Sequence, residues 1–276
     1  MSEQPHTPPD EGEIHAAELA QTEEEGLKET AEDRLSDLVE AVWERKVLDR
    51  GFVRLVGHMG GDVAVVQSAR VSFGHGSKGE EKDRRLIDYL IKHHHETPFE
   101  HAVFKFHVKC PIFVARQWFR HRWASYNEIS GRYTTFDEGE MHLPEVLRVP
   151  DRANKQGSTG RIDPDVEKQL LARMKEHQET TWALYEELMG RGVAKEIARE
   201  VLPLSLFTEF YWTVNARSLM NFIRLRAEQH AQYEIRRYAL ALRDVFRETM
   251  PWTYDAFLEH IWKDLSTGIE QQQAER

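Results

Sequence analysis

The sequence has little cysteine and no long hydrophobic run. Its 276 residues include one cysteine, Cys110, which excludes a disulfide within the chain and fits a reducing cytoplasm. No run of about 18 apolar residues occurs, so we expect no transmembrane helix. The first residues are acidic and lack an apolar segment, so we expect no secretory signal either. Together these absences predict a cytoplasmic protein that is not held by a membrane.

An overall excess of basic residues is also missing. The formal net charge is −10, and residues 1–46 account for all of it with 14 acidic and 4 basic residues. The rest of the chain is balanced, so it has no general positive field of the kind that attracts nucleic acid. We therefore expect no nucleic-acid partner. Arginine clusters in the balanced part are local, and a local cluster suggests a bound anion.

Several common catalytic motifs are absent. The sequence contains no P-loop, no GxGxxG turn and no GxSxG serine elbow. Cys110 falls on the apolar face of a predicted strand, which favours a core residue over a nucleophile. The segment at 93–101, "HHHETPFEH", invites a zinc interpretation. Pro98 interrupts it, however, and no two histidines have the i, i+4 spacing of a helical zinc site, so we expect no metal.

What is present is a small number of strands among many helices. Strands are predicted at 52–59, 101–110 and 206–214, where apolar residues alternate or β-branched and aromatic residues gather. Helical patterns are predicted at 62–73, 78–96, 111–124, 163–190, 194–202 and 216–232, and in a further segment through Phe246. We predict α+β architecture with one domain over 49–265. It follows an acidic extension over 1–48, disordered and then helical from 31, and precedes a polar tail over 266–276.

The densest polar segment covers residues 120–133, "RHRWASYNEISGRY". On the predicted helix that enters it, Gln117, Arg120 and His121 have i, i+3, i+4 spacing and share a face. A polar loop is expected over 125–132, where turn-forming residues expose backbone N–H groups that suit phosphate oxygens. Arg132 adds a planar fork of donors. A charge run usually faces water, but the interleaved aromatic residues favour a cleft here.

A second polar cluster lies on the predicted helix over 216–232. Arg217 with Asn221, and Arg226 with His230, have i, i+4 spacing. Such a helix is costly to pack unless a polar ligand satisfies these groups. The residues alone thus predict an anion-binding α+β enzyme. A nucleotide-binding regulatory protein without turnover remains an alternative, and so does an RNA-binding module, which the balanced charge disfavours.

The segment at 120–132 also fits the signature RHRxxSxNExSxR at every specified position. Together with "SARVSF", "HETPFEH", "PIFVARQWFRHR" and "WTVNARSLMNFIRLR", it resembles the flavin-dependent thymidylate synthases over about residues 50–262. The resemblance implies a twisted antiparallel sheet flanked by helices, in a homotetramer whose active sites are shared between subunits. It also implies that the protein is a methyltransferase that converts dUMP to dTMP by reductive methylation. The carbon donor would be 5,10-methylenetetrahydrofolate and the hydride source non-covalent FAD reduced by NADPH, without a cysteine nucleophile.

The resemblance further implies roles for individual residues. Arg226 would stabilise negative charge at N3 of the uracil, and His95 is similar to a histidine linked to folate use; these two are the candidate catalytic residues. Positions similar to the dUMP-binding ones are Gln117, Trp118, Phe119, Arg120, Glu128, Ile129, Ser130, Gly131, Arg132, Arg199 and Arg226. Positions similar to the FAD-binding ones are Ser72, Thr97, Glu100, Arg120, His121, Arg122, Asn127, Asn215, Ala216, Arg217, Asn221 and His230. Within the dUMP set, Glu128 and residues 130–132 would serve an adjacent subunit, with Arg132 on the phosphate.

Overall fold

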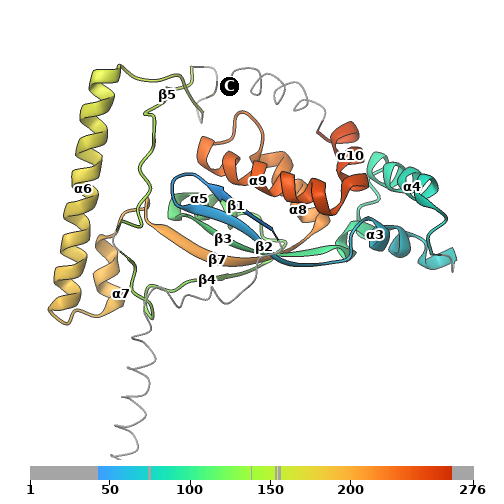
Figure 1. Ribbon diagram of the computed structural model, residues 1–276, viewed down its shortest axis with the longest axis horizontal. Helices are drawn as coiled ribbons and strands as arrows, with labels where there is room; N and C mark the ends of the chain where they lie inside the picture. The colour runs from blue at the N-terminus through green and yellow to red at the C-terminus, as the bar shows by residue number, and fades with distance from the viewer. Residues whose placement is uncertain (1–42, 74–75, 138, 153, 155–156, 263–276) are drawn as a thin grey trace, which may run out of the picture. The chain divides into compact units, whose positions relative to one another are not determined.

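A five-stranded antiparallel sheet organises the chain (Figure 1). The computed structural model describes residues 43–73, 76–137, 139–152, 154 and 157–262. In spatial order the strands are β1 (Trp43–Val47), β2 (Gly51–Met59), β3 (Val103–Pro111), β7 (Phe207–Asn215) and β4 (Ser125–Glu128). This arrangement confirms the predicted α+β class and its antiparallel sheet. The three strands predicted from sequence form β2, β3 and β7.

The two central strands form because apolar residues alternate along both of them. In β3, Phe104, Phe106, Val108 and Cys110 are at most 2% exposed and share one face of the sheet, as the sequence predicted. In β7, alternate residues are buried in the same way, and Trp212 lies opposite Phe106 with the two rings stacked. The resulting face is apolar and needs a covering layer of helices.

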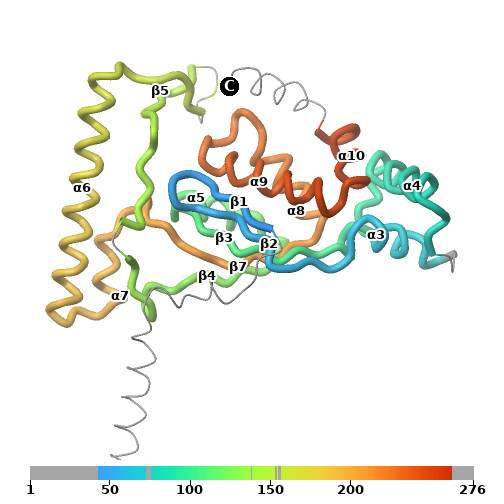
Figure 2. Tube along the Cα trace, in the orientation of Figure 1, coloured from blue at the N-terminus to red at the C-terminus, as the bar shows by residue number. Residues whose placement is uncertain are grey.

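Helices cover this apolar face (Figures 1 and 2). Tyr238 is a fully buried example: its hydroxyl donates to the Lys109 carbonyl oxygen at 2.8 Å, which ties α9 to β3. Gly51 permits this approach, because a Cβ there would collide with the Tyr238 hydroxyl. The helices of the described chain are α3 (Asp62–Ala69), α4 (Glu80–Lys92), α5 (Ile112–Trp118), α6 (Pro164–Gly190), α7 (Lys195–Ala198), α8 (Ala216–Arg226), α9 (Tyr233–Thr249) and α10 (Pro251–His260). Of these, α6 and α7 lie to one side of the sheet (Figure 1) and contribute to a second, smaller apolar cluster.

Short elements complete the described chain. Three are 3₁₀ turns: η2 (Val71–Phe73), η3 (Thr97–His101) and η4 (Arg199–Val201). A small hairpin, β5 (Val149–Pro150) with β6 (Ser158–Thr159), interrupts the long loop predicted over 134–162. Among the described residues, no helix is both long and apolar enough to cross a bilayer.

Two helix starts follow the capping residues that the sequence contains. The Asp163 carboxylate accepts from the N–H groups of Asp165 and Val166 at 3.0 and 3.1 Å, and so begins α6. The Asn215 side chain accepts from the Ser218 N–H at 2.9 Å and begins α8. Both contacts satisfy N–H groups that have no partner within the helix, which is why these residue types mark helix starts.

The prediction of a helix over residues 31–48 is wrong for the last residues of that range. Residues 43–47 form strand β1, which pairs with β2 in a hairpin, with Val47 opposite Gly51. Residues 31–42 lie outside the described part of the chain. Because β1 completes one edge of the sheet, the folded domain includes residues that we had assigned to the extension. Backbone pairing with β2 outweighs the weak helical pattern here.

Three further expectations around the polar segments need correction. Helix α5 ends at Trp118 and helix α8 ends at Arg226, several residues earlier than predicted. Gln117, Arg120 and His121 therefore do not share a helical face, and Arg226 and His230 are not a helical i, i+4 pair. Residues 125–128, expected in a loop, form edge strand β4 because β7 offers it an open row of backbone partners.

We predict that the buried ion pair between Arg70 and Asp83 is a main contributor to local stability. The two side chains are 9% and 1% exposed and lie 2.5 Å apart. Replacing Asp83 by Ala leaves the arginine buried without its partner, so we expect a loss of about 3–5 kcal/mol in the free energy of unfolding, measured with urea. The control is Glu81→Ala on the same helix, because its pair with Arg85 is exposed and should contribute under about 1 kcal/mol. Equal losses in the two variants would contradict the prediction.

Candidate active site

An arginine-rich cavity of about 330 Å³ lies between the turn after α5, the end of β7 and helix α8. Its polar lining comes from Arg120, His121, Arg122, Ser218, Asn221 and Arg226. Trp123, Trp212 and Leu225 add apolar walls. The structure thus brings together the two polar clusters that the sequence contained, although they are about 100 residues apart in the chain.

Arg226 is the centre of this cavity's hydrogen bonds. Its Nε donates to Nε2 of His121 at 3.0 Å, and its Nη2 donates to the Gln117 carbonyl oxygen at 3.3 Å. An arginine can only donate, so the His121 ring accepts through Nε2 and carries its proton on Nδ1. Burial, with the charge of Arg226 as a smaller cause, lowers the pKa of His121 to about 4. The imidazole is therefore neutral at physiological pH.

The cavity has a surplus of positive charge. Within the described residues, Arg120, Arg122 and Arg226 make no ion pair with a carboxylate. Burial, followed by the charge of the nearby Arg120, lowers the pKa of Arg226. The charged form of this guanidinium is therefore less stable in the cavity than in water. Unpaired arginines around one cavity are expected where an anion binds.

A buried hydroxyl in the cavity wall also lacks a partner. Ser218 Oγ is inaccessible and has no hydrogen bond among the described residues. Buried polar atoms are nearly always paired, so this atom indicates a ligand or a water at the site. Together with the amide of Asn221, the guanidinium groups and the exposed face of Trp123, it gives the cavity donors, acceptors and an aromatic plane. Such groups suit a ligand that is both polar and aromatic.

Other predicted FAD residues lie beside the cavity rather than in it. Arg217 donates to Glu96 and Glu100 at 2.8 and 2.6 Å, and its guanidinium lies 5.2 Å from the Trp123 ring centre. The hydrogen bond that Arg217 donates to Glu100 raises the pKa of Arg217. Asn215 serves as the cap of α8, and Thr97 lies with Glu100 on η3.

The remaining FAD candidates are more scattered. Ala216 is fully buried, and its N–H donates to the Ala102 carbonyl oxygen. Ser72 is exposed on η2, Asn127 is exposed on β4, and His230 is exposed in the turn after α8. The structure therefore unites part of the predicted set and leaves their contact with FAD as a prediction.

His95 does not line the cavity. It follows α4, its N–H donates to the Leu90 carbonyl oxygen at 2.8 Å, and its exposed ring lies 5.8 Å from that of Tyr89. Its predicted link with folate use remains a prediction.

Trp118 and Phe119 have mainly a packing role in this chain. Trp118 is 0% exposed and packs against Phe210, Trp212 and Phe222, with ring centres 4.7–5.4 Å apart. Phe119, partly buried, packs edge-on against Phe210 at 5.0 Å. These contacts hold the end of α5, and with it the backbone of Gln117 and Arg120, against the sheet. Their predicted contribution to substrate binding would act through that backbone.

A second group of predicted residues lies beyond the other end of β4. Glu128 accepts from the Thr208 hydroxyl at 2.7 Å, and the Ile129 N–H donates to the Glu209 carbonyl oxygen at 2.9 Å. Ser130 follows, and then Gly131, where a Cβ would lie 2.7 Å from the Phe136 ring and 3.2 Å from Cδ of Arg199. A side chain at this position would require the Phe136 ring to move.

Arg132 extends from this second group into solvent. Its Nε lies 3.5 Å from a Glu196 carboxylate oxygen, and both side chains are more than half exposed. The ring of Tyr133 lies under its guanidinium at 5.7 Å. An exposed pair of this kind is weak, so the guanidinium is available to a stronger anion.

The two groups are separated by the length of strand β4. Ala124 lines the cavity, whereas Ile129 begins the second group. At about 3.3 Å per residue, the five steps between them span roughly 17 Å. One chain therefore does not bring the residues around Arg226 and those around Arg132 into one compact site.

Sequence reasoning missed several residues that contact the predicted set or line its cavity, among them Ser218 and Gln232. Gln232, just before α9, accepts through its side-chain oxygen from the side-chain amide of Gln117. The two residues are 115 positions apart, and a glutamine ahead of a helix carries no local signal of such a partner.

Comparison with known proteins identifies the family. The model described as "Thymidylate synthase complementing protein" matches residues 54–252. The chain belongs to the thymidylate synthase complementing protein family. Flavin-dependent thymidylate synthase from Thermosipho africanus is 53% identical over 228 residues, covering 82% of this chain and 100% of that protein. A protein of the same name from Thermus thermophilus is 51% identical over 215 residues, 78% of each chain.

Solved structures agree with this membership of the thymidylate synthase complementing protein family. The UMP/dUMP methylase PolB from Streptomyces cacaoi, bound with 5-Br UMP, has a TM-score of 0.70 and 33% sequence identity. The match covers 78% of this chain and 96% of that chain. The family resemblance drawn from residues 120–132 is thereby confirmed.

We predict that His121 titrates near pH 4 and that Arg226 contributes to this low pKa. The unfolded residue takes up a proton near its ordinary pKa of 6.5, so the free energy of unfolding should fall as the pH drops from about 6.5 to about 4. Arg226→Met should raise the pKa of His121, but not to 6.5, because burial is the larger cause. NMR titration of the imidazole measures both effects. Arg116→Met, at an exposed position of α5, is the control, and an unchanged pKa in Arg226→Met would show that its charge has no influence.

Proposed function

We propose that this chain is a flavin-dependent thymidylate synthase, which methylates dUMP to dTMP. The observation that carries the proposal is the cavity beside the start of β4, where three arginines without a carboxylate partner among the described residues meet an unpaired serine hydroxyl. Family membership, and relatives that carry this name at about half identity, support the same activity. We place the reaction in the cytoplasm, as the single cysteine predicts.

FAD is the proposed cofactor, bound without a covalent bond. In this proposal Arg120, Arg122 and Asn221 bind its polar groups, Ser218 supplies a hydrogen bond, and Trp123 covers an aromatic face. His121, neutral and fixed by Arg226, can donate through its Nδ1–H without adding charge beside the ring system. When bound and reduced by NADPH, the flavin supplies the hydride for the methylation.

The nucleotide is proposed to bind between two chains. Arg226 and Gln117 would approach the base from the cavity side, and the positive charge of Arg226 would stabilise negative charge that develops at N3. Ser130, Arg132 and Arg199 of an adjacent chain would bind the phosphate. The length of β4 between the two groups supports this division, because one chain cannot reach the ligand with both.

A homotetramer is the proposed assembly. Val166, Leu170 and Met174 belong to the apolar stripe predicted for α6, yet they are 47%, 38% and 39% exposed in the single chain. Thr181 and Tyr185 of the same stripe are buried within the chain. Covering the exposed residues with another subunit would remove apolar surface from water, which favours association.

No thiol chemistry is proposed. Cys110 is fully buried in β3, and burial raises the pKa of its thiol well above the ordinary value. A buried, protonated thiol is a poor nucleophile. The one-carbon unit is proposed to come from 5,10-methylenetetrahydrofolate, with His95 near its entry.

We predict that the purified protein is yellow, is bleached by NADPH, and converts dUMP to dTMP when the folate is added. The Cys110→Ala variant should do so at a rate within about twofold of the original chain, because the thiol is buried and makes no bond to substrate. Product is measured by chromatography and flavin by its visible absorption. A protein that binds nucleotide but takes up no flavin would favour the regulatory alternative. A folded, flavin-loaded Cys110→Ala variant without activity would contradict the cysteine-free route.

We further predict that two inactive variants restore activity together. Arg132→Ala removes a charged contact to phosphate and should weaken dUMP binding about 30-fold, which corresponds to about 2 kcal/mol. Arg226→Ala should be nearly inactive as well. After mixing and reassembly, some sites combine an intact Arg132 from one chain with an intact Arg226 from another.

Subunit exchange must be shown with differently tagged chains before the mixing result is interpreted. The control mixes Gln117→Ala with Arg226→Ala, two residues of the same group, and should recover no activity. If exchange occurs and the first mixture stays inactive, both arginines act within one chain.

A further inference from the structure

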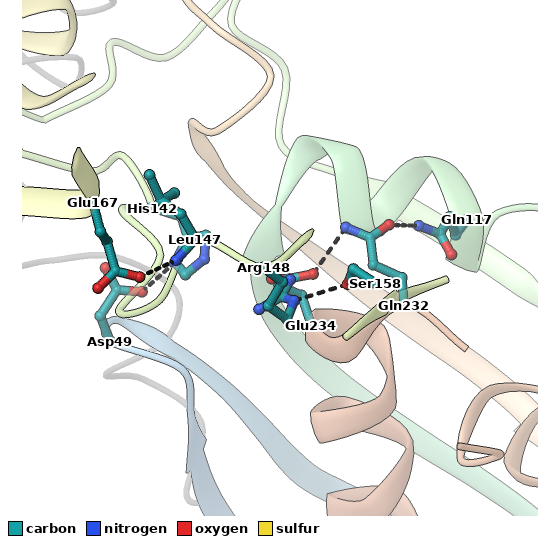
Figure 3. A network of polar contacts seen from close by, with 9 residues as sticks. All are labelled: Asp49, Gln117, His142, Leu147, Arg148, Ser158, Glu167, Gln232 and Glu234. Carbon is teal, nitrogen blue, oxygen red and sulfur yellow. Dashed lines mark hydrogen bonds and ion pairs between the residues drawn. The ribbon is translucent and has the colours of Figure 1, made fainter. Parts of the chain in front are cut away.

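A chain of polar contacts leads away from Gln117 (Figure 3). The Gln117 side-chain amide on α5 donates to Oε1 of Gln232. Nε2 of Gln232 donates to Oε2 of Glu234 at 2.8 Å, and Oε1 of Glu234 accepts from Nη2 of Arg148 at 2.5 Å. Nε of Arg148 donates to the Ser158 hydroxyl at 2.9 Å. Of these residues, only Gln117 belongs to the predicted substrate contacts.

Glu234 fixes the direction of the bonds between it and Gln117. Glu234 is 3% exposed; burial alone would raise its pKa, but hydrogen bonds from Arg148, its own backbone and Gln232 lower it overall. Its carboxylate is therefore ionised and can only accept. Gln232 must turn its N–H₂ group to Glu234 and its oxygen to Gln117.

The orientation of Gln232 also determines the orientation of the Gln117 side chain. A free glutamine side chain can exchange its oxygen and nitrogen by a half turn at little cost. Here the Gln232 oxygen requires a donor, so Gln117 must offer it Nε2. Its own oxygen points away from Gln232, as Figure 3 shows, and is left to accept a hydrogen bond.

We propose that Gln232 and Glu234 are positioning residues that hold the Gln117 oxygen ready to accept a hydrogen bond from the bound nucleotide. The donor on the nucleotide is either the N3–H of the base or the 3′-hydroxyl of the sugar, since both are single donors next to acceptor groups. The proposal rests on the proposed function in taking dUMP as the ligand. It assigns to the residues behind Gln117 the role of setting its orientation.

The first test replaces Gln232 by Leu, which has a similar size but no hydrogen bond to either neighbour. The dissociation constant of dUMP, measured by calorimetry on the FAD-loaded protein, should rise about tenfold, the effect of one misdirected hydrogen bond. The flavin content should not change, because the cavity residues of α8 are untouched. Ser158→Ala is the matched control. It lies at the exposed end of the same chain of contacts and should leave dUMP binding unchanged.

Two analogues identify the donor. N3-methyl-dUMP lacks the base donor, and the 2′,3′-dideoxy nucleotide lacks the sugar donor. With the analogue that lacks the true donor, Gln232→Leu and the original protein should bind with equal affinity. With the other analogue the tenfold difference should persist. A full difference with both analogues would overturn the proposal, because the oxygen of Gln117 would then meet neither group.

The second test reverses the direction of the bonds. The variant Gln117→Glu places a carboxylate at each end of Gln232. The side-chain oxygen of Gln232 must then face one of these two carboxylates, which repel it. We therefore expect dUMP binding to weaken more than tenfold. Adding Glu234→Gln lets Gln232 turn round, donate to the new carboxylate at position 117, and accept from the new amide at position 234. Position 117 again presents an acceptor, and about tenfold of the lost affinity should return. If Gln232 only stabilised the fold, the double variant would not recover dUMP affinity.

The outcomes separate this inference from the proposed function. If the original protein binds no dUMP, the proposed function fails. If it binds dUMP while Gln232→Leu binds it equally well, only the inference fails. If Gln232→Leu loses flavin and nucleotide together, or the double variant is no better than Gln117→Glu, Gln232 acts as a structural residue and the inference is overturned.

Discussion

The pairing of β4 with β7 determines how the candidate site is arranged. Tyr126 lies opposite Trp212 and Glu128 opposite Phe210, so the polar segment after α5 is held straight along the sheet edge. The cavity forms where this segment enters the strand, and the Arg132 group forms where it leaves. Without this pairing, the same residues could fold back into a single loop around one anion. The sheet instead places them in two separate groups.

The cavity keeps its positive charge because its supporting structure is apolar. The rings of Trp118, Phe210 and Phe222 pack beneath the end of α5 and beneath α8. They fix the backbone carbonyl of Gln117 and the ring of His121, and these two groups hold Arg226. Three guanidinium groups without carboxylates among the described residues repel one another, so the aromatic packing must offset that cost until an anion binds. The charge of Arg226 also contributes, after burial, to the low pKa of His121.

Much of the fold could be predicted because the signals were local. Alternation in β3 and β7 depends on adjacent residues, and the caps Asp163 and Asn215 bond within three residues of themselves. β1 and β4 could not be predicted, since each is polar and takes its strand form from the neighbour that it pairs with. The ends of α5 and α8 were missed because neither helix is followed by a proline or glycine that would mark its end.

The candidate site was also predictable only in part from the sequence. Its residue types were visible in the signature segment, and the meeting of Arg120 with Arg226 was expected from the family resemblance. The helical spacing that first grouped Gln117, Arg120 and His121 was wrong, yet the tight turn after α5 still gathers them around Arg226. Gln232 could not be found, because its bond to Gln117 depends on how the start of α9 packs beside α5.

The two groups differ in how firmly the chain itself holds them. The cavity residues come from α5, β7 and α8, which pack into the buried core, whereas Ser130 to Arg132 follow an edge strand of four residues. The contacts that tie this second group down include the Ile129 bond to β7 and the close packing of Gly131 against Phe136 and Arg199. In the proposed function, the flavin site would therefore be preformed in each chain, whereas the phosphate site would take its final geometry from an adjacent chain. Substrate binding would then depend on assembly more strongly than cofactor binding does.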